Sequence, residues 1–291
     1  MKIFVTGASG WVGSAVVPDL LAAGHRVLGL ARSDKSTDAL RAAGADVQRG
    51  DLEDLDSLRS GAQDADGVIH LAFRHDFDNF TDAGELDRNA ITALGQTLAG
   101  SGRPLVVTSG TGGHAPGQVV TEDRSASPEM PRLSEQAALA FTESGVRVAI
   151  VRLAPSVHGK GDYGFVPRLI DVARHKGVSA YVGDGANRWS AVHRDDAAVL
   201  FRLAVEDAPT GSVLHGIGEE AIATRAIAES IGSHLGIPAT SIPPENAMDH
   251  FGWIGAFFSL DIPASSAITQ QRFAWQPTGI GLLEDLDQHY F

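Results

Sequence analysis

The sequence has no cysteine among its 291 residues, which excludes disulfide bonds, cysteine nucleophiles, thiolate zinc sites and iron–sulfur clusters. Lysine is scarce, and 23 basic side chains face 36 acidic ones, giving a formal net charge of −13. Because this acidic chain has no basic run, we expect no nucleic-acid partner and no membrane partner. No apolar run reaches the ~20 residues that span a bilayer, and the chain begins with a strand and a glycine turn rather than a signal peptide. We therefore expect a cytoplasmic protein.

Apolar residues make up 43% of the chain, which is enough to form a buried core. Over the first 155 residues, short apolar runs typical of strands alternate with stretches of helical spacing. Strands are expected at 2–6, 25–31, 45–52, 66–72, 103–109 and 147–153, with a seventh at 210–218. Apolar strands that alternate with helices indicate a parallel sheet covered on both faces. The predicted fold is α/β, a Rossmann-type doubly wound sheet of about seven strands.

Helical spacing predicts helices at 11–24, 85–100, 132–145, 165–177, 194–207 and 223–236. Gly24 is placed to end the first helix, and Pro18 predicts a kink in it or a late start. The strand–helix alternation breaks after residue 155. We therefore predict a dinucleotide-binding domain at 1–155, to which 186–218 return. A small, discontinuous C-terminal substrate lobe is expected from 156–185 and 219–291.

A glycine motif directly follows the first strand and opens the first helix. It reads Thr-Gly-Ala-Ser-Gly-Trp-Val-Gly over residues 6–13. Gly7 permits a tight turn, Gly10 lets the backbone approach a pyrophosphate, and Gly13 lets the helix pack closely on the strand. The amide groups of the helix N-terminus then face the phosphates. This arrangement predicts a dinucleotide site.

The end of the second strand bears on which dinucleotide binds. A site that prefers NAD places a carboxylate there to bind the ribose hydroxyls. Here the strand ends at Arg32 and Ser33. A guanidinium and a hydroxyl suit a 2′-phosphate, so we predict NADP, with NAD as the alternative and Arg32 as a solvated loop charge in that case.

These residues resemble the extended short-chain dehydrogenase/reductase superfamily, of the NAD-dependent epimerase/dehydratase type. The resemblance also rests on Gly-Asp-Gly at 183–185, Ala-Val-His-Arg-Asp-Asp at 191–196 and Trp-Gln-Pro at 275–277. It implies a homodimer and a ligand at the carboxyl ends of the strands. The residues that would contact the cofactor are Gly7, Ser9, Gly10, Trp11, Val12, Arg32, Ser33, Asp51, Leu52, Leu71, Ala72, Phe73, Asn89 and Thr108.

The chain departs from this superfamily at the catalytic Tyr-x-x-x-Lys pair. None of its three tyrosines is followed four residues later by lysine. In the natural register Arg132 and Gln136 replace the pair and share one helix face; a shift of one residue would place Pro131 and Glu135 there. Arg132 then binds ribose or a substrate oxyanion, or it simply pairs with Glu135.

Three residues are our candidates for catalysis: Ser109, Arg132 and His158. Ser109 stands at the end of the fifth strand, where the superfamily keeps its catalytic hydroxyl, and it can polarise a carbonyl. An arginine does not release its proton at neutral pH, whereas His158 can exchange one there. No spacing typical of a metal site is present, so we predict none. The aromatic run at 251–258 favours packing over a substrate pocket.

The resulting hypothesis is an NAD(P)-dependent oxidoreductase that transfers a hydride between nicotinamide and a carbonyl or imine of a small organic molecule. Two alternatives stay open. One is an epimerase or dehydratase acting on a nucleotide sugar, whose chemistry depends on the missing tyrosine. The other is a non-catalytic NADP-binding sensor.

Overall fold

The computed structural model describes residues 1–76, 79–112, 117–125 and 132–291. The chain forms two compact units. Unit 1 consists of residues 1–109, 125–152 and 197–214, and unit 2 of residues 110–124, 153–196 and 215–291.

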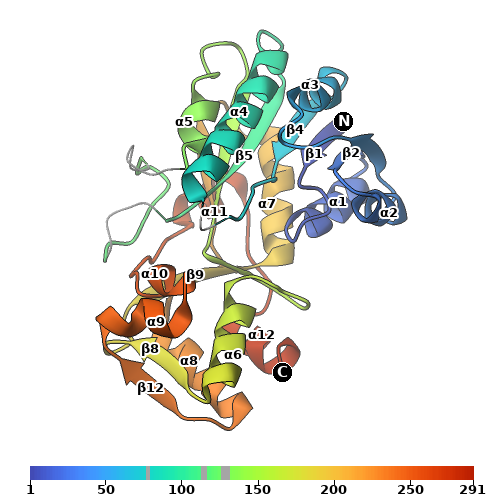
Figure 1. Ribbon diagram of the computed structural model, residues 1–291. Coiled ribbons are helices and arrows are strands. Elements are labelled where there is room, and N and C mark those ends of the chain that lie inside the picture. The colour runs from blue at the N-terminus through green and yellow to red at the C-terminus, as the bar shows by residue number, and fades with distance from the viewer. Residues whose placement is uncertain (77–78, 113–116, 126–131) are drawn as a thin grey trace. The chain divides into compact units, whose positions relative to one another are not determined.

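Unit 1 carries a seven-stranded sheet with the order β3-β2-β1-β4-β5-β6-β10 (Figure 1). Its strands are β1 (Lys2–Thr6), β2 (Arg26–Ala31), β3 (Asp46–Arg49), β4 (Gly67–His70), β5 (Pro104–Gly110), β6 (Arg147–Leu153) and β10 (Ser212–Gly216). All seven predicted strands are thereby confirmed. The central pairs β1–β2, β2–β3, β1–β4 and β4–β5 are parallel.

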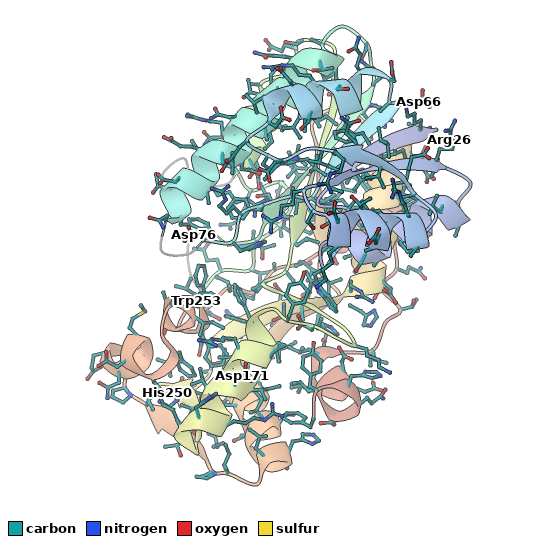
Figure 2. The ribbon with its side chains drawn as sticks, turned by 45° about the vertical axis from the view of Figure 1, so that its right-hand side comes forward. Arg26, Asp66, Asp76, Asp171, His250 and Trp253 are labelled. Atoms are coloured by element: carbon teal, nitrogen blue, oxygen red, sulfur yellow. The ribbon has the colours of Figure 1, made fainter. Side chains whose placement is uncertain are left out.

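The strand order reverses between β1 and β4, because β2 and β3 extend the sheet to one side of β1 and β4 extends it to the other. In doubly wound sheets the ligand binds at the carboxyl ends of the strands beside such a reversal. Figure 2 labels side chains on both edges of the sheet: Arg26 and Asp66 at the amino edge, and Asp76 in the segment that follows the carboxyl end of β4. The glycine motif follows β1 and so lies at the carboxyl edge.

Helices cover both faces of this sheet (Figure 1). They are α1 (Gly13–Ala22), α2 (Asp34–Ala42), α3 (Leu55–Gln63), α4 (Phe80–Leu98), α5 (Ser134–Leu139) and α7 (Arg194–Asp207). Leu58 of α3, Leu94 of α4 and Ala138 of α5 pack with Phe4 and Val148 of the strands in one buried cluster. This burial holds α3, α4 and α5 on one face of the sheet.

Two sequence predictions about helices need correction. Helix α1 begins at Gly13 and runs through Pro18, whose side chain is exposed, so the late start considered for this helix is wrong; the kink stays a prediction. Gly24 follows this helix with φ +85°, which is the left-handed conformation expected of a terminating glycine. The helix predicted at 132–145 is shorter and begins only at Ser134.

Unit 2 contains two small sheets, β11-β9-β7 and β12-β8. Their strands are β7 (Ser156–His158), β8 (Ser179–Val182), β9 (Arg188–His193), β11 (Glu219–Ala223) and β12 (Ala239–Ile242). The helices are α6 (Phe165–Lys176), α8 (Thr224–Leu235), α9 (Ala247–Phe251), α10 (Ile254–Phe258), α11 (Ala267–Phe273) and α12 (Leu282–His289), with a 3₁₀ turn at Pro244–Asn246.

The units divide the chain at different residues from the predicted domains. Residues 110–124 and 186–196 belong to unit 2. The segment 186–196 contains β9, which pairs with β7 and β11 and has no place in the seven-stranded sheet. No helix in the described ranges is long and apolar enough to cross a bilayer.

Candidate functional site

The glycine corner, residues 7–13, is shaped by close backbone contacts. Gly7 has φ +65°, and a Cβ atom there would lie 2.7 Å from the amide nitrogen of Ala72. A Cβ atom at Gly13 would lie 2.2 Å from the carbonyl oxygen of Gly7. At Gly10 the nearest contact would be the same oxygen at 3.1 Å, and no other atom of the described residues would lie within 4 Å. Packing therefore requires Gly7 and Gly13, whereas Gly10 borders open space.

The N-terminus of α1 opens onto this corner. Val12 is the N-cap residue, and no side chain caps the helix within the described chain. Ser9 is exposed, and Trp11 and Val12 are half-buried. Backbone amides at a helix N-terminus without a side-chain cap fit an anionic group such as a pyrophosphate. The corner thus fits the dinucleotide that the sequence predicted.

The end of β2 places Arg32 and Ser33 beside helix α2. Arg32 is exposed, and the Ser33 hydroxyl caps α2 by accepting a hydrogen bond from the Ser36 amide at 3.2 Å. Arg49, from the end of β3, lies 3.2 Å from the Asp34 carboxylate and donates to the Thr37 hydroxyl at 3.0 Å. Sequence reasoning missed Arg49, because only the pairing of β3 with β2 brings it to α2.

The segment that follows β3 holds Asp51 and Leu52, both half-buried. The carboxylate of Asp51 accepts a hydrogen bond from the Glu53 amide at 3.1 Å, which shapes this turn. Asn89, the predicted contact on α4, is exposed, whereas Asp87 on the same helix is buried. Both the Asp51–Leu52 pair and Asn89 remain predictions from the resemblance.

Arg132 is a cation held by several contacts at the carboxyl edge of the sheet. Its Nε donates to the Ser134 hydroxyl at 2.9 Å, and its Nη2 donates to the backbone carbonyl of Thr108 at 2.8 Å. Its guanidinium carbon lies 4.1 Å from the ring centroid of Phe73. These contacts hold the guanidinium in place, and within the described ranges Nη1 makes no hydrogen bond.

Behind Arg132 lies a chain of buried polar side chains. The Ser134 hydroxyl donates to Asp87 Oδ2 at 2.5 Å, and Asp87 Oδ1 lies 3.0 Å from His70 Nε2. His70 Nδ1 lies 2.8 Å from the hydroxyl of Thr6, the residue directly before the glycine corner. Thr6, His70, Asp87 and Ser134 are each at most 1% exposed. We call these four residues and Arg132 the buried chain.

The surroundings of Asp87 and Arg132 shift the pKa of each group. Burial alone would raise the pKa of Asp87, but its contacts with His70, Ser134 and the charge of Arg132 outweigh burial and hold that pKa below its usual value. Burial lowers the pKa of Arg132, against the opposing attraction of Asp87 and Glu135. Asp87 stays ionised at neutral pH because its pKa is lowered, and Arg132 stays ionised because the ordinary pKa of arginine lies far above neutral pH.

The structure does not bring Arg132 and Gln136 onto one helix face. Arg132 precedes α5, and Gln136 is exposed. Glu135 is buried and pairs with Arg152 of β6, at 2.8 Å and 2.7 Å. Glu135 therefore pairs with Arg152 and not with Arg132, and neither register of the replaced pair is tested. Pro131, the other member of that register, lies outside the described residues.

Of the remaining catalytic candidates, Ser109 is half-buried near the end of β5 in unit 1. His158 lies in unit 2 and is 1% exposed. Its Nδ1 lies 2.8 Å from Asp285, which also contacts His289 at 2.7 Å. Burial lowers the pKa of His158, and the Asp285 carboxylate opposes this. The Asp285 contacts were not apparent from the sequence, because 127 residues separate the two partners.

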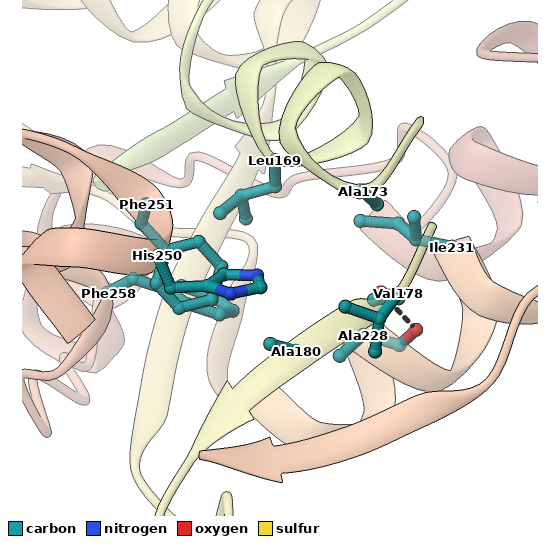
Figure 3. Close-up of a pocket in the computed structure, with 10 residues that line it drawn as sticks. Leu169, Ala173, Val178, Ala180, Ala228, Ile231, His250, Phe251 and Phe258 are labelled. Carbon is teal, nitrogen blue, oxygen red and sulfur yellow. Dashed lines mark hydrogen bonds between the residues drawn. The ribbon is translucent and has the colours of Figure 1, made fainter. Parts of the chain in front are cut away.

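Unit 2 also contains a small cavity, shown in Figure 3, between α6, β8, α8 and α9. Its walls are largely apolar, with the imidazole of His250 among Leu169, Phe251 and Phe258. Burial, together with the charge of Lys176, lowers the pKa of His250 and keeps it neutral. Phe251 and Phe258 belong to the buried core of unit 2, which agrees with the packing role favoured for the aromatic run. We assign this cavity to packing.

Comparisons with known proteins agree with this geometry. The model of the NAD dependent epimerase/dehydratase family matches residues 3–215. An uncharacterized protein of Schizosaccharomyces pombe is 50% identical over 289 residues, 98% of each chain. The 2-alkyl-3-oxoalkanoate reductase of Stenotrophomonas maltophilia is 29% identical over 74% of this chain and 68% of its own. A dTDP-glucose 4,6-dehydratase structure from Streptomyces venezuelae has TM-score 0.79 and 20% identity, covering 100% of this chain and 96% of that one, which shows a shared fold.

Proposed function

The chain belongs to the NAD dependent epimerase/dehydratase family, and from this premise we propose that it is an NAD(P)-dependent oxidoreductase acting on a carbonyl or imine of a small organic molecule. Family membership supports the broader class, an NAD-dependent oxidoreductase or epimerase. Similarity to a reductase of 3-oxoalkanoates supports carbonyl chemistry. An epimerase or dehydratase is less favoured, because the tyrosine on which that chemistry depends has no counterpart at the expected position.

One observation carries the proposal: Arg132 is held at the carboxyl edge of the sheet by Thr108 and Ser134, and its Nη1 donates to none of the described residues. A guanidinium fixed in this way stabilises negative charge that develops on a substrate oxygen. It does not act as the proton donor, since arginine stays protonated.

In unit 1 the glycine corner binds the cofactor, whereas Arg132 takes part in the reaction. The glycine corner binds the pyrophosphate through its backbone amides; Phe73 lies in the segment that follows β4, and Thr108 lies near the carboxyl end of β5. When bound, the nicotinamide supplies the hydride. As a C–H bond forms at the carbonyl carbon, the C=O π pair moves to oxygen, and Arg132 stabilises the resulting alkoxide until water protonates it. A protonated imine accepts the hydride and becomes a neutral amine, with no further acid required.

We propose NADP as the preferred cofactor. Arg32 is exposed beside the N-terminus of α2, and Arg49 lies at the same helix end. Two guanidinium groups at a helix N-terminus suit the extra phosphate of NADP. The Asp34 side chain is 96% exposed, so water screens its ion pair with Arg49. This ion pair therefore competes only weakly with a phosphate for Arg49.

The test combines titration and turnover. Purified protein is titrated with NADPH and NADH by nicotinamide fluorescence, and then aldehydes, ketones and imines are screened at 340 nm. We expect NADPH binding, and turnover that falls about 10²–10³-fold in Arg132→Ala. Arg88→Ala, an exposed arginine of α4, is the matched control. Binding without turnover of any substrate would favour the sensor hypothesis, and full activity in Arg132→Ala would remove Arg132 from the chemistry.

A further inference from the structure

The buried chain connects the glycine corner to Arg132 without a break. Its members come from four places in unit 1: Thr6 ends β1, His70 ends β4, Asp87 lies on α4, and Ser134 begins α5 beside Arg132. Each link is 3.0 Å or shorter. Every hydrogen bond of the buried chain joins two side chains, so none of these bonds belongs to a helix or a strand.

The chemistry of the donor and acceptor groups indicates the direction of each hydrogen bond in the buried chain. The Arg132 Nε–H donates to the Ser134 oxygen, so the Ser134 hydroxyl proton is free to donate to Asp87. On the other side, the Thr6 oxygen accepts from the Ala72 amide at 3.3 Å and lies 2.8 Å from His70 Nδ1. Because the ionised Asp87 carboxylate only accepts, His70 carries a proton on Nε2 and donates it to Asp87, and in the neutral ring Nδ1 accepts the Thr6 proton. The buried chain therefore has two arms that end on the Asp87 carboxylate: one runs from Arg132 through Ser134, and the other from Thr6 through His70.

From these hydrogen bonds we propose that Asp87 is the positioning residue for Arg132, acting through Ser134. His70 and Thr6 hold Asp87 in a fixed position relative to the glycine corner. This role rests on the proposed function, because it gives Arg132 its orientation toward a substrate oxygen. The Asp87 carboxylate is 1% exposed and accepts hydrogen bonds from two donors, which fix its orientation. The fixed carboxylate in turn orients the Ser134 hydroxyl, which holds the guanidinium of Arg132. Preorganisation of this kind is what an electrostatic catalyst needs.

Two variants separate the arms. Asp87→Asn keeps the size but offers one acceptor and one amino group, so one of its two donors loses its partner. With the carbonyl oxygen kept toward Ser134, His70 must move its proton to Nδ1. Ser134→Ala cuts the link to Arg132 and leaves the His70 arm intact. Glu85→Gln, an exposed acid on the same helix, is the matched control.

Nitrogen NMR of the intact protein reads both arms. Signals are assigned with His70→Gln and Arg132→Lys. We expect the Nε2–H form of His70 in the wild type and in Ser134→Ala, and a protected Arg132 Nε–H signal in the wild type that is lost in Ser134→Ala. Asp87→Asn should either shift the His70 proton to Nδ1 or expose the Arg132 signal. An Nδ1–H form in the wild type, or an Arg132 signal unchanged in Ser134→Ala, would overturn the proposal.

Kinetics supply a second readout with any substrate found at 340 nm. Because small misplacement of a catalytic group can cost about 10²-fold, we expect Asp87→Asn and Ser134→Ala to lower kcat about that much, with the Kd for NADPH within about twofold of wild type. In an Arg132→Ala background the same changes should cost nothing further. An undiminished effect there would contradict positioning through Arg132. Failure of both NADPH and NADH to bind would instead refute the proposed function, and the NMR signals would still test the role of Asp87.

Discussion

The three glycines of the corner should fail in different ways when given a side chain. In Gly13→Ala the new Cβ would meet the Gly7 carbonyl oxygen at 2.2 Å and the carbonyl group of Ala8 at 2.7 Å. All these atoms are backbone, so helix α1 must move away from the corner. In Gly10→Ala the new Cβ meets one oxygen at 3.1 Å, which requires a shift of a few tenths of an ångström.

These distances translate into separate expectations for stability and for binding. Overpacking costs about 1–3 kcal/mol, and the contact at Gly13 belongs at the upper end. Replacing glycine by alanine in a helix returns up to ~1 kcal/mol, so we expect a net loss of about 2 kcal/mol for Gly13→Ala. For a chain of this size that loss lowers Tm by about 4–8 °C. Gly10→Ala should leave Tm nearly unchanged and weaken NADPH binding tenfold or more, since its methyl group occupies the space of the pyrophosphate.

Thermal unfolding followed by circular dichroism, together with NADPH fluorescence titration, measures both effects. Gly112→Ala is the control, because a Cβ there meets no atom of the described residues within 4 Å and its φ is not in the left-handed region. If Gly10→Ala bound NADPH as tightly as the wild type while folding normally, Gly10 would not face the phosphates. The assignment of the corner as the dinucleotide site would then be refuted.

Three further predictions concern charged residues. Arg32→Ala should weaken NADPH binding about 10–100-fold in a fluorescence titration and leave NADH within about twofold; an equal loss for both would refute the contact with the 2′-phosphate. Because the folded pKa of Asp87 lies below its unfolded value of about 3.9, its stabilisation is complete above that pH and is lost as pH falls through the folded pKa. The difference in unfolding free energy between wild type and Asp87→Asn in urea should therefore shrink below about pH 4, and a constant difference would contradict this. Asp285→Ala, which removes the hydrogen-bond partner of the buried His158, should destabilise by about 1–3 kcal/mol in urea unfolding, whereas the exposed Glu284→Ala should not.

The strands and the glycine corner could be predicted because their signals are local. A strand such as residues 2–6 shows itself in a short apolar run, and the requirement for glycine at position 7 follows from a tight turn that comes next. Helix ends were harder to predict. Pro18 suggested a kink or a late start, but α1 already begins at Gly13, and the helix predicted at 132–145 begins only at Ser134.

Asp87 illustrates why part of the site was missed. It lies on α4 among Ala83, Ala90 and Leu94, all buried, so an acidic residue interrupts an apolar face at helical spacing. That interruption was the available signal, whereas the resemblance pointed to Asn89, which is exposed. A carboxylate on a buried face needs a partner, but the sequence does not say which one.

The sequence alone thus determined the parallel sheet, its strand ranges and the glycine corner, because apolar periodicity and the freedom of glycine act over a few neighbouring residues. Only the tertiary structure decided the neighbours of Arg132. Asp87 is separated from Ser134 by 47 positions and from His70 by 17, and Thr6 is separated from His70 by 64. Contacts over such separations depend on how α4 and α5 pack on the sheet, and the burial of many apolar side chains together fixes that packing.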